Sequence, residues 1–338
     1  MPDISILLPC FNAGSCLEEA LDSLLTQTYP NFEIIAVDDG STDATLEILQ
    51  AIGQIDPRLV VLAEPHRGVV GAANRGLSAC RGEIIARMDA DDRCHPERVA
   101  KQRDFLLTHD DIDVVSCLVE GFPADAVGEG FQIYYRWLNS LIDHEDIARE
   151  IFVESPIANP SAAFRREWIQ SLGGYQELGW PEDYDLWLRA YLAGSRFAKI
   201  PEVLVYWREH PERLTHTDSR YSVENFLRAK AHYLANGPAR DRDAIIIWGA
   251  GMTGRRLSKH IEREGLPLEA FVDVDQKKIG REKRGRPIIG ADELMGLWET
   301  YQHPILLTAV RARSAEPLIR ASLEELGLIE GKDWWRAA

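Results

Sequence analysis

The chain has 338 residues, of which 45% are apolar and 27% are charged, so it is long enough for about two soluble globular domains. Its 38 basic and 54 acidic residues give a net charge of −16, and the first 240 residues carry the whole excess with 22 bases and 38 acids. Such an acidic surface disfavours nucleic-acid binding, and it indicates that a phosphate-containing ligand would be bound through a metal ion.

Hydropathy and cysteine usage indicate the cellular compartment in which the protein resides. No apolar run reaches the roughly 18 residues that a membrane-spanning helix needs, and the first residues lack the basic leader and long apolar stretch of a secretion signal. The five cysteines form no CxxC pair, which favours reduced thiols over disulfides or a cysteine-ligated metal. We therefore expect a cytoplasmic protein, with peripheral contact at the inner face of a membrane as the alternative.

The first hundred residues alternate between strand and helix patterns. Short runs rich in β-branched residues predict strands at 4–8, 33–37, 60–64 and 83–89, and apolar residues at helical spacing predict helices at 17–27, 45–54 and 71–79. This alternation is typical of a parallel sheet covered by helices. The sequence therefore predicts a nucleotide-type α/β unit.

The rest of the chain continues this α/β class and then starts a second domain. Helices are expected at 131–142, at 144–152 and within 181–194, followed by a strand at 202–207. Turn formers and charges at 236–243 then precede a strand at 244–248, a glycine turn, a helix at 255–264 and strands at 270–274 and 304–310. We expect domains at 1–238 and 239–338, the second a small Rossmann-like α/β domain.

Polar motifs follow the first two expected strands. The segment PCFN contains Pro9, Phe11 and Asn12, and the segment DDGSTD begins with Asp38 and Asp39. The two strands should be neighbours, so these motifs would meet at the carboxyl edge of the sheet, where open α/β sheets bind ligands. There Phe11 could support a nucleobase, and Asp39 could accept a hydrogen bond from its imino N–H.

A third motif, DADD, follows the strand expected at 83–89. Asp89 and Asp91 bracket one residue at the end of that strand, where alternate side chains point the same way, and Asp92 lies beside them. Converging carboxylates are suitable ligands for Mg²⁺ or Mn²⁺, which proteins commonly hold with one or two carboxylates and the substrate's phosphates. The motif therefore predicts a divalent cation as cofactor.

Each of these motifs also has a purely structural interpretation. Residues 38–43 could form only a turn and a helix cap, with Ser41 or Thr42 at the N-cap position. Residues 89–92 could form an exposed acidic turn, although three crowded acids repel one another unless a cation neutralises them.

Taken together, the ordered motifs resemble the family 2 glycosyltransferases, which are inverting enzymes of the GT-A fold, over about residues 3–215. The matching segments are SILLPCFNAGSCLEEALDSLLTQTYPNFEIIAVDDGSTD, RGEIIARMDADD and GGYQELGWPEDYDLWLRA. The resemblance implies that the nucleoside of a nucleotide-sugar, usually uridine, is bound by Pro9, Phe11 and Asp39, with Asn12, Asp38 and Asp89 nearby. It also implies that Asp89, Asp91 and Asp92 reach the metal and the ribose.

The resemblance further implies that Asp183, in the pair with Glu182, is the general base. An acceptor hydroxyl becomes a good nucleophile when a carboxylate within hydrogen-bond reach takes its proton. Attack opposite the departing diphosphate would invert the anomeric centre, while the metal stabilises charge on the leaving group. The structural alternative is that Glu182 and Asp183 only favour the positive end of a helix.

Several further positions have two interpretations. Trp180 could stack on an acceptor sugar or only pack at a helix entry, and Arg208 and His210 could approach the diphosphate and metal or be structural. Ala73 stands where relatives often have an arginine, so Arg67 or Arg75 would have to supply that phosphate contact. Asn159 stands where many relatives have histidine.

In the second domain, Gly249, Gly251 and Gly254 follow a strand and open a helix, and Asp273 ends the next strand. This spacing is typical of a nucleotide-binding fingerprint, in which glycines let the backbone approach a phosphate. The module is similar to the small N-terminal domain of bacterial sugar acyltransferases, so it could bind a sugar nucleotide or be a remnant used for assembly. Hydride transfer is disfavoured, because no substrate domain follows.

Two features near the carboxyl terminus remain open. The basic run 277–286 reads as a solvated loop, with contact to anionic lipid or phosphate as the alternative. Trp334 and Trp335 could contact a membrane or another subunit, or could pack under the sheet.

The sequence therefore predicts a metal-dependent inverting glycosyltransferase that moves a hexosyl or N-acetylhexosaminyl group from a UDP-sugar to a hydroxyl of a saccharide or lipid-linked saccharide in polysaccharide biosynthesis. A homo-oligomer is a further expectation. The alternatives are a sugar-nucleotide nucleotidyltransferase, for which residues 12–15 are a poor phosphate loop, and a non-catalytic nucleotide-sugar sensor.

Overall fold

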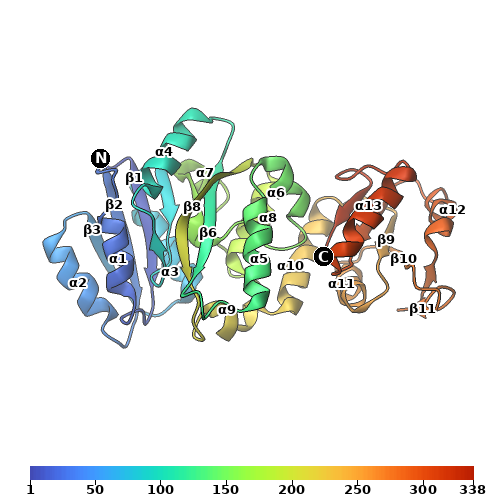
Figure 1. Ribbon diagram of the computed structural model, residues 1–338, viewed down its shortest axis with the longest axis horizontal. Helices are drawn as coiled ribbons and strands as arrows, with labels where there is room; N and C mark the ends of the chain where they lie inside the picture. Colours follow the sequence, from blue (N-terminus) through green and yellow to red (C-terminus); the bar gives the residue numbers. More distant parts are fainter. The chain divides into compact units, whose positions relative to one another are not determined.

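The computed structural model describes residues 1–338, apart from the side chain of Arg313. The chain folds into two compact units, each built around one β-sheet (Figure 1). The first unit comprises Met1–Ile147, Pro156–Leu178 and Asp185–Thr217, and the second comprises Ala148–Ser155, Gly179–Tyr184 and Asp218–Ala338.

The first unit contains an eight-stranded mixed sheet with the order β3-β2-β1-β4-β7-β6-β8-β5. Its strands are β1 (Ile4–Cys10), β2 (Phe32–Asp39), β3 (Leu59–Glu64), β4 (Ile84–Arg87), β5 (Arg93–Cys94), β6 (Val114–Phe122), β7 (Ala163–Arg165) and β8 (Phe197–Arg208). The parallel arrangement predicted for the first hundred residues is confirmed, since β2 pairs with both β1 and β3, and β1 with β4, in parallel. Strand β7 runs antiparallel to β4 and β6, which makes the sheet mixed.

Helices connect these strands. As far as Thr217 they are α1 (Leu17–Leu25), α2 (Thr45–Ile55), α3 (Gly68–Ala79), α4 (Arg98–Thr108), α5 (Glu129–Ser140), α6 (His144–Glu150), the 3₁₀ helix η1 (Asn159–Ser161), α7 (Arg166–Ser171), α8 (Glu182–Leu192) and α9 (Leu214–Thr217). The predicted helices and strands are found within a few residues of their expected bounds. The elements of this unit that were not predicted are β5, β6, β7, α4, η1, α7 and α9.

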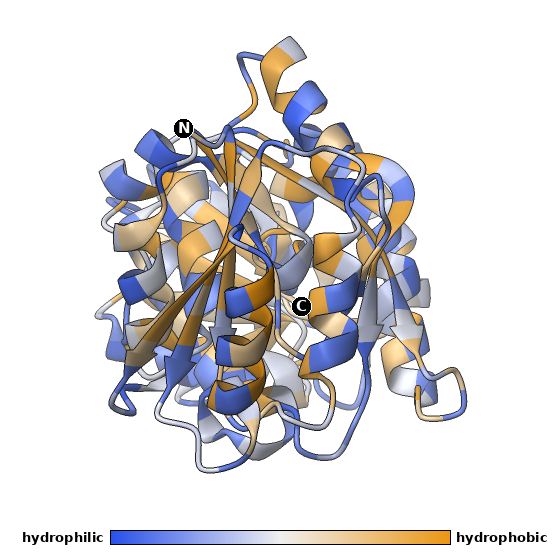
Figure 2. Ribbon diagram, turned by 90° about the vertical axis from the view of Figure 1, so that its left-hand side faces the viewer, coloured by the Kyte–Doolittle hydropathy of each residue, from blue (hydrophilic) through white to orange (hydrophobic). Residues whose placement is uncertain are grey.

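Amphipathic periodicity explains how these helices cover the sheet. In α1 the side chains of Leu17, Leu21 and Leu24 recur on one helical face, and all three are buried. They pack in one core with the apolar residues of β1 and β2. Figure 2 shows the pattern as orange and blue bands along the helices, beside strands that are largely orange.

The second unit contains a six-stranded sheet with the order β11-β12-β10-β9-β13-β14. Its strands are β9 (Ala244–Trp248), β10 (Leu268–Val272), β11 (Glu282–Lys283), β12 (Arg286–Ile289), β13 (Pro304–Thr308) and β14 (Trp334–Arg336). Its helices are η2 (Ser219–Tyr221), α10 (Val223–Asn236), α11 (Met252–Arg263), η3 (Ala291–Glu293), α12 (Leu294–Trp298), η4 (Arg313–Ala315) and α13 (Glu316–Glu325). All pairs along β12-β10-β9-β13-β14 are parallel, as in a doubly wound sheet.

Two expectations for the second unit are corrected or decided by its structure. The basic run 277–286 is not only a loop, because β11 and the start of β12 form an antiparallel hairpin within it. Trp334 and Trp335 belong to β14 and are buried, so packing accounts for both side chains. In the part of the chain that the structure describes, no helix combines the length and the apolar character needed to cross a membrane.

Lys199 is a buried lysine between the sheet and a helix of the first unit. It lies on β8, its Nζ donates to the carbonyl oxygen of Leu138 in α5 at 2.6 Å, and it is only 3% exposed. Burial lowers the pKa of Lys199 to about 7. The unfolded chain, in which lysine keeps its ordinary pKa near 10.5, therefore binds an extra proton between about pH 7 and 10.

We predict that the stability of the wild type rises with pH relative to Lys199→Met over this range. The unfolded wild type holds the extra proton, so its free energy of unfolding should gain up to about 1.4 kcal/mol per pH unit relative to the variant. Urea denaturation at pH 7, 8 and 9, followed by tryptophan fluorescence, measures the difference. Lys277→Met, which removes an exposed lysine, is the control, and identical pH slopes for Lys199→Met and wild type would contradict the prediction.

Candidate active site

Hydrogen bonds join the loops that follow β1 and β2. Asn12, which adopts a φ of 50°, accepts from the Thr42 N–H through Oδ1 at 2.9 Å and donates its own N–H to Ser41 Oγ at 3.0 Å. The N–H of Gly14 donates to Asp43 Oδ2 at 2.9 Å. Asn12 therefore holds the two loops together at the carboxyl edge of the sheet.

The helix-cap interpretation of residues 38–43 is wrong in detail. Helix α2 begins at Thr45 with Ala44 at the N-cap position, so neither Ser41 nor Thr42 caps it. Both hydroxyl residues contact Asn12 instead.

Asp39 lies at the end of β2 in a closely packed polar group. Its side chain is 4% exposed, Oδ1 accepts from the Arg67 N–H at 2.8 Å, and Oδ2 lies 2.9 Å from Nδ1 of His66. The ring of His66 stacks on Phe11, with 4.3 Å between the ring centroids. The structure therefore brings Phe11 and Asp39 together, as predicted, and adds His66, which belongs to no motif of the sequence.

The neighbouring positions Asp38 and Pro9 are set by strand register. Residue 9 of β1 pairs with Val37 of β2, and residue 10 pairs with Asp38. Asp38 is buried, its Oδ2 accepts from the Ser41 N–H at 3.4 Å, and its Oδ1 has no hydrogen-bond partner among the residues that the structure describes. A buried carboxylate oxygen without a hydrogen-bond partner is uncommon in folded proteins.

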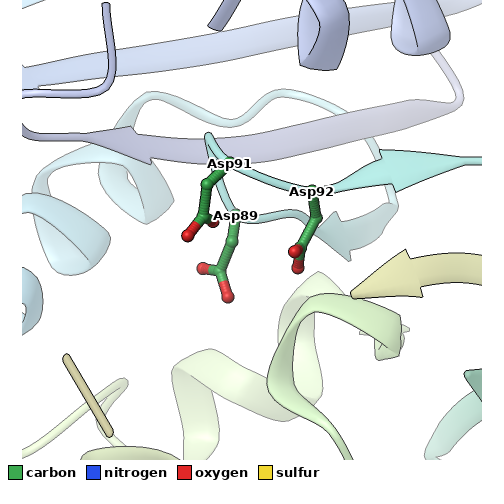
Figure 3. A group of neighbouring side chains, drawn as sticks. All are labelled: Asp89, Asp91 and Asp92. Atoms are coloured by element: carbon green, nitrogen blue, oxygen red, sulfur yellow. The ribbon is translucent and has the colours of Figure 1, made fainter. Parts of the chain in front are cut away.

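The three aspartates of the DADD motif form one cluster. One carboxylate oxygen from each of Asp89, Asp91 and Asp92 lies within 4.8 Å of the others, and Figure 3 shows all three carboxylates on the same side of the turn between β4 and β5. The predicted convergence is present, but its stated reason is wrong. Strand β4 ends at Arg87, so a turn and not strand alternation brings the aspartates together.

Basic side chains and a backbone N–H contact the carboxylates of this cluster. Nη2 of Arg87 lies 2.6 Å from Asp89, and Nε2 of His210 lies 2.9 Å from Asp91. Asp92 is fully buried, and its Oδ1 accepts from the Arg208 N–H at 2.7 Å. The other oxygen of Asp92 has no hydrogen-bond partner in the described part of the chain.

The remaining repulsion appears in the pKa values. Burial, opposed by Arg87 and reinforced by Asp91, raises the pKa of Asp89. Burial and the charges of Asp91 and Asp89 raise the pKa of Asp92 well above its ordinary value. The donor set consists of hard carboxylate oxygens with one unpartnered buried atom, so these residues fit a Mg²⁺ or Mn²⁺ ion.

Arg98, a buried arginine that no sequence motif indicated, supports the turn that carries the three aspartates. Arg98 is 1% exposed and donates through Nη2 to the carbonyl oxygen of Arg87 at 2.6 Å. Its Nε donates to Gln102 Oε1 at 3.0 Å, and Gln102 in turn donates to the carbonyl oxygen of Ser161 at 2.8 Å. Arg98 therefore fixes the backbone immediately before the aspartates and places a positive charge beneath them.

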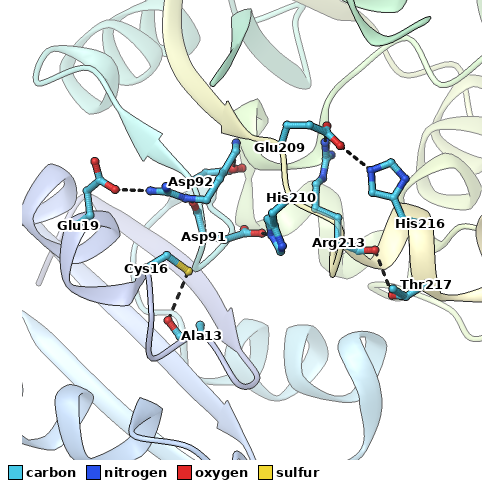
Figure 4. A network of polar contacts seen from close by, with 11 residues as sticks. Ala13, Cys16, Glu19, Asp91, Asp92, Glu209, His210, Arg213, His216 and Thr217 are labelled. Atoms are coloured by element: carbon cyan, nitrogen blue, oxygen red, sulfur yellow. Dashed lines mark hydrogen bonds and ion pairs between the residues drawn. The ribbon is translucent and has the colours of Figure 1, made fainter. Parts of the chain in front are cut away.

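Arg208 and its neighbours complete the surroundings of the turn. Nε of Arg208 donates to the carbonyl oxygen of Asp91 at 2.6 Å, and its Nη2 pairs with Glu19, which also binds Arg93. Glu19, Asp91 and Asp92 are labelled in Figure 4. The guanidinium groups of Arg208 and Arg93 lie 4.4 Å and 4.1 Å from the centroid of the Phe122 ring. In this structure Arg208 therefore orients the turn.

The chain segment after Arg208 is held by a second ion-pair group, which also appears in Figure 4. Glu209 is buried and binds both Arg213, at 2.6 Å, and His216. Burial alone would lower the pKa of Arg213, but its interactions with the acidic groups of Tyr135, Asp92 and Glu209 outweigh it and raise that pKa. The cation of Arg213 is therefore kept beside the acidic cluster.

The two arginines proposed to replace the missing one near Ala73 differ in their contacts. Arg75 pairs with Glu64 at 2.6 Å, whereas Arg67 is exposed and its backbone N–H binds Asp39. Arg67 is therefore the better placed of the two arginines for a ligand phosphate.

Asn159, which stands where many relatives have histidine, is buried and accepts from the hydroxyl of Tyr175 at 3.0 Å.

The Glu182-Asp183 pair begins helix α8 and belongs to the second unit. Glu182 is 3% exposed and accepts from the hydroxyl of Tyr221 at 2.8 Å, whereas Asp183 is partly exposed and accepts from the N–H of Tyr184 at 2.7 Å. Burial and the charge of Glu182 raise the pKa of Tyr221, which keeps this hydroxyl a donor. Of the two carboxylates, Asp183 is the more accessible.

Trp180 is a packed residue of the second unit. It is 8% exposed, and its ring contacts His232 and Tyr233, with centroid distances of 5.4 Å and 6.4 Å. The guanidinium of Arg228 lies 5.5 Å from the same ring. Of the two interpretations of Trp180, its low exposure favours packing at the helix entry over stacking on an acceptor sugar.

The glycine turn of the second unit is compact. A Cβ on Gly254 would lie 1.8 Å from the carbonyl oxygen of Gly249, which itself has a φ of 120°, and Gly251 immediately precedes helix α11. Asp273 accepts from the Ala250 N–H at 3.0 Å and binds Lys278 at 2.9 Å. The carboxylate that would reach a ribose in a nucleotide fingerprint therefore binds groups of its own domain.

Comparison with known proteins identifies both parts of the sequence. Residues 5–173 match the model of glycosyl transferase family 2, and residues 241–332 match a family described as C2185-like, N-terminal. A glycosyltransferase of Haemophilus influenzae is 31% identical over 68% of this chain and 71% of its own length. The amylovoran biosynthesis glycosyltransferase AmsE of Erwinia amylovora is 31% identical over 60% of this chain and 74% of its own length.

Solved structures support the same assignment at the level of the fold. S. aureus TarS 1-349, solved in complex with UDP, is 21% identical with a TM-score of 0.55, and the match covers 78% of this chain and 71% of that one. The mannosyltransferase PcManGT from Pyrobaculum calidifontis, solved with GDP-Man and Mn²⁺, is 23% identical with a TM-score of 0.51 over 69% and 62% of the two chains. The predicted GT-A fold is confirmed, and the chain is a glycosyltransferase that belongs to glycosyl transferase family 2.

Proposed function

We propose that the protein is a metal-assisted, inverting glycosyltransferase that moves a hexosyl or N-acetylhexosaminyl group from a UDP-sugar to a hydroxyl of a saccharide or lipid-linked saccharide. The observation that carries this proposal is the cluster of Asp89, Asp91 and Asp92 beyond β4. Strand β4 adjoins β1, and the end of β1 leads to Phe11. The aspartate cluster and the loops after β1 and β2 thus belong to the same edge of one sheet.

The nucleoside of the donor would bind at Phe11 and Asp39. An aromatic ring gives a nucleobase a stacking surface, and a carboxylate accepts its imino N–H. Arg67 would contact the diphosphate, since its side chain is exposed and its backbone N–H binds Asp39. The UDP complex of TarS supports a uridine donor, and the GDP-Man complex of PcManGT supports a nucleotide-sugar of some kind.

The aspartate cluster would hold a divalent cation. Two carboxylate charges within 4.8 Å of each other repel by at least about 3 kcal/mol at an effective dielectric constant of about 20, so a cation between them removes a substantial cost. Bound there, Mg²⁺ or Mn²⁺ would neutralise charge on the leaving diphosphate. Arg87 and His210 would keep Asp89 and Asp91 oriented toward it, and Arg98 would fix the turn.

Asp183 would take the proton of the acceptor hydroxyl. Its carboxylate is more accessible than that of Glu182, which is buried against the hydroxyl of Tyr221. Glu182 would therefore position the start of α8. The name of AmsE, an enzyme of amylovoran biosynthesis, supports a saccharide acceptor.

The second part of the chain, residues 239–338, would be an accessory domain appended to a transferase domain at 1–238. Strands β9 to β14 all fall after residue 239, and the two family matches lie on either side of that boundary. Homo-oligomer formation and peripheral contact with the cytoplasmic face of a membrane belong to the same proposal.

We predict that Asp91→Ala abolishes metal-dependent donor binding. The substitution removes one of three converging ligands and leaves His210 without its partner. Isothermal titration of UDP in Mn²⁺ and in chelator should show at least tenfold stronger binding with Mn²⁺ for the wild type and no difference for the variant. Asp110→Asn, at a side chain that is 97% exposed, is the control, and equal wild-type affinity in metal and chelator contradicts the prediction.

We predict that Asp183→Asn keeps donor binding and lowers kcat for transfer by about 10²-fold to 10⁴-fold, the usual contribution of a general base. Glu182→Gln, whose amide oxygen still accepts from Tyr221, should lose less than tenfold. Transfer to a panel of saccharide acceptors measures both variants. Equal losses for the two variants would remove the distinction between base and positioning residue.

Product analysis separates the proposed function from its alternatives. A wild type that releases pyrophosphate from UTP and a sugar phosphate is a nucleotidyltransferase. A wild type that binds UDP-sugars with Mn²⁺, yet neither hydrolyses nor transfers them, is a sensor.

A further inference from the structure

We propose that the imidazole of His66 occupies the base subsite when no donor is bound, and that a nucleobase binds by displacing it. The inference rests on the proposed nucleoside site at Phe11 and Asp39, and it adds a residue that regulates access to that site.

The stacking geometry gives the first argument. The centroids of the His66 and Phe11 rings are 4.3 Å apart with an interplanar angle of 29°, so the imidazole covers a face of the phenyl ring. Phe11 is nevertheless 47% exposed, which is unusual for a large apolar side chain outside a binding surface. A nucleobase that stacks on the covered face has to replace the imidazole.

The hydrogen bonding of Asp39 gives the second argument. Nδ1 of His66 lies 2.9 Å from Oδ2 of Asp39 and 3.0 Å from its carbonyl oxygen. Both atoms are acceptors, so Nδ1 carries the hydrogen. Oδ1 already accepts from the Arg67 N–H, and the Asp39 side chain is only 4% exposed. The N–H of a ligand therefore reaches Oδ2 only after the imidazole has moved.

These two contacts are the same pair that the proposed uracil site requires. In each case a planar ring lies on Phe11 and a ring N–H points to Asp39. Because one ring at a time can make both contacts, the imidazole and the base compete for the subsite.

The surroundings of His66 allow its side chain to move while its backbone stays fixed. The side chain is 56% exposed, so the ring can turn toward solvent without displacing buried atoms. The backbone N of His66 lies only 2.8 Å from where a Cβ on Gly40 would be, and the next residue is bonded to Asp39. Displacement is therefore a side-chain rotation on a fixed loop.

Competition of this kind reduces the apparent affinity for the donor. The measured Kd equals the intrinsic Kd divided by the fraction of molecules with an open subsite. If the imidazole fills the subsite about nine-tenths of the time, removing it strengthens nucleotide binding about tenfold.

Calorimetric titration of UDP with Mn²⁺ into four proteins tests the proposal. We expect His66→Ala to bind UDP about three to ten times more tightly than the wild type, and Phe11→Ala to bind it more weakly. His109→Ala is the matched control, because His109 also stacks on a phenylalanine, Phe105, at 4.1 Å but lies in no proposed site. It should match the wild type.

The outcomes distinguish this proposal from the function on which it rests. Weaker UDP binding by His66→Ala, or binding within twofold of the wild type, overturns the displacement model. In the first case the imidazole would contribute to nucleotide binding, and in the second it would have no effect on it. If the folded wild type binds neither UDP nor GDP with Mn²⁺, and Asp39→Ala changes nothing, the proposed nucleotide-sugar function itself is overturned.

Discussion

Mutual repulsion among three carboxylates in one turn is the constraint on which the arrangement of the candidate site depends. Asp89, Asp91 and Asp92 lie within 4.8 Å of one another in a unit that already carries most of the acidic residues. The fold places basic side chains from several segments around this turn, namely Arg87 from the preceding strand, Arg98 from helix α4, Arg208 from the end of β8 and Arg213 from the segment that follows, while His210 contacts Asp91. Even so, one oxygen of the buried Asp92 has no hydrogen-bond partner among the described residues, so the compensation there is incomplete without a ligand.

The proposed nucleoside site depends instead on the register of two parallel strands. Pairing of β1 with β2 brings their carboxyl ends together, and the contacts of Asn12 with residues 41 and 42 then lock the loops. Asn12 therefore acts through the loops that it joins. This explains why an asparagine with a positive φ stands beside Phe11, for which we propose a role in ligand binding together with Asp39.

Local patterns in the sequence predicted much of this arrangement. Alternation of β-branched and helical segments was enough for strands β1 to β4, and motif order was enough to bring Phe11 and Asp39 together. The pattern failed where contacts between distant segments decide the structure. Nothing local shows that Arg98 is buried against the carbonyl of Arg87, or that His66 crosses to Asp39, because each contact joins separate elements. Strand alternation also gave a wrong reason for a correct cluster, since the chain turns after Arg87.

The glycine turn of the second unit shows that close packing alone can require the glycine spacing of a nucleotide-binding fingerprint. With no room for a methyl group between Gly254 and the carbonyl of Gly249, the first turn of α11 sits directly on the end of β9. The acid that completes the pattern, Asp273, is likewise occupied by Ala250 and Lys278. A domain of this kind could therefore bind no small molecule and still require these glycines, because they allow the helix to pack against the end of the strand.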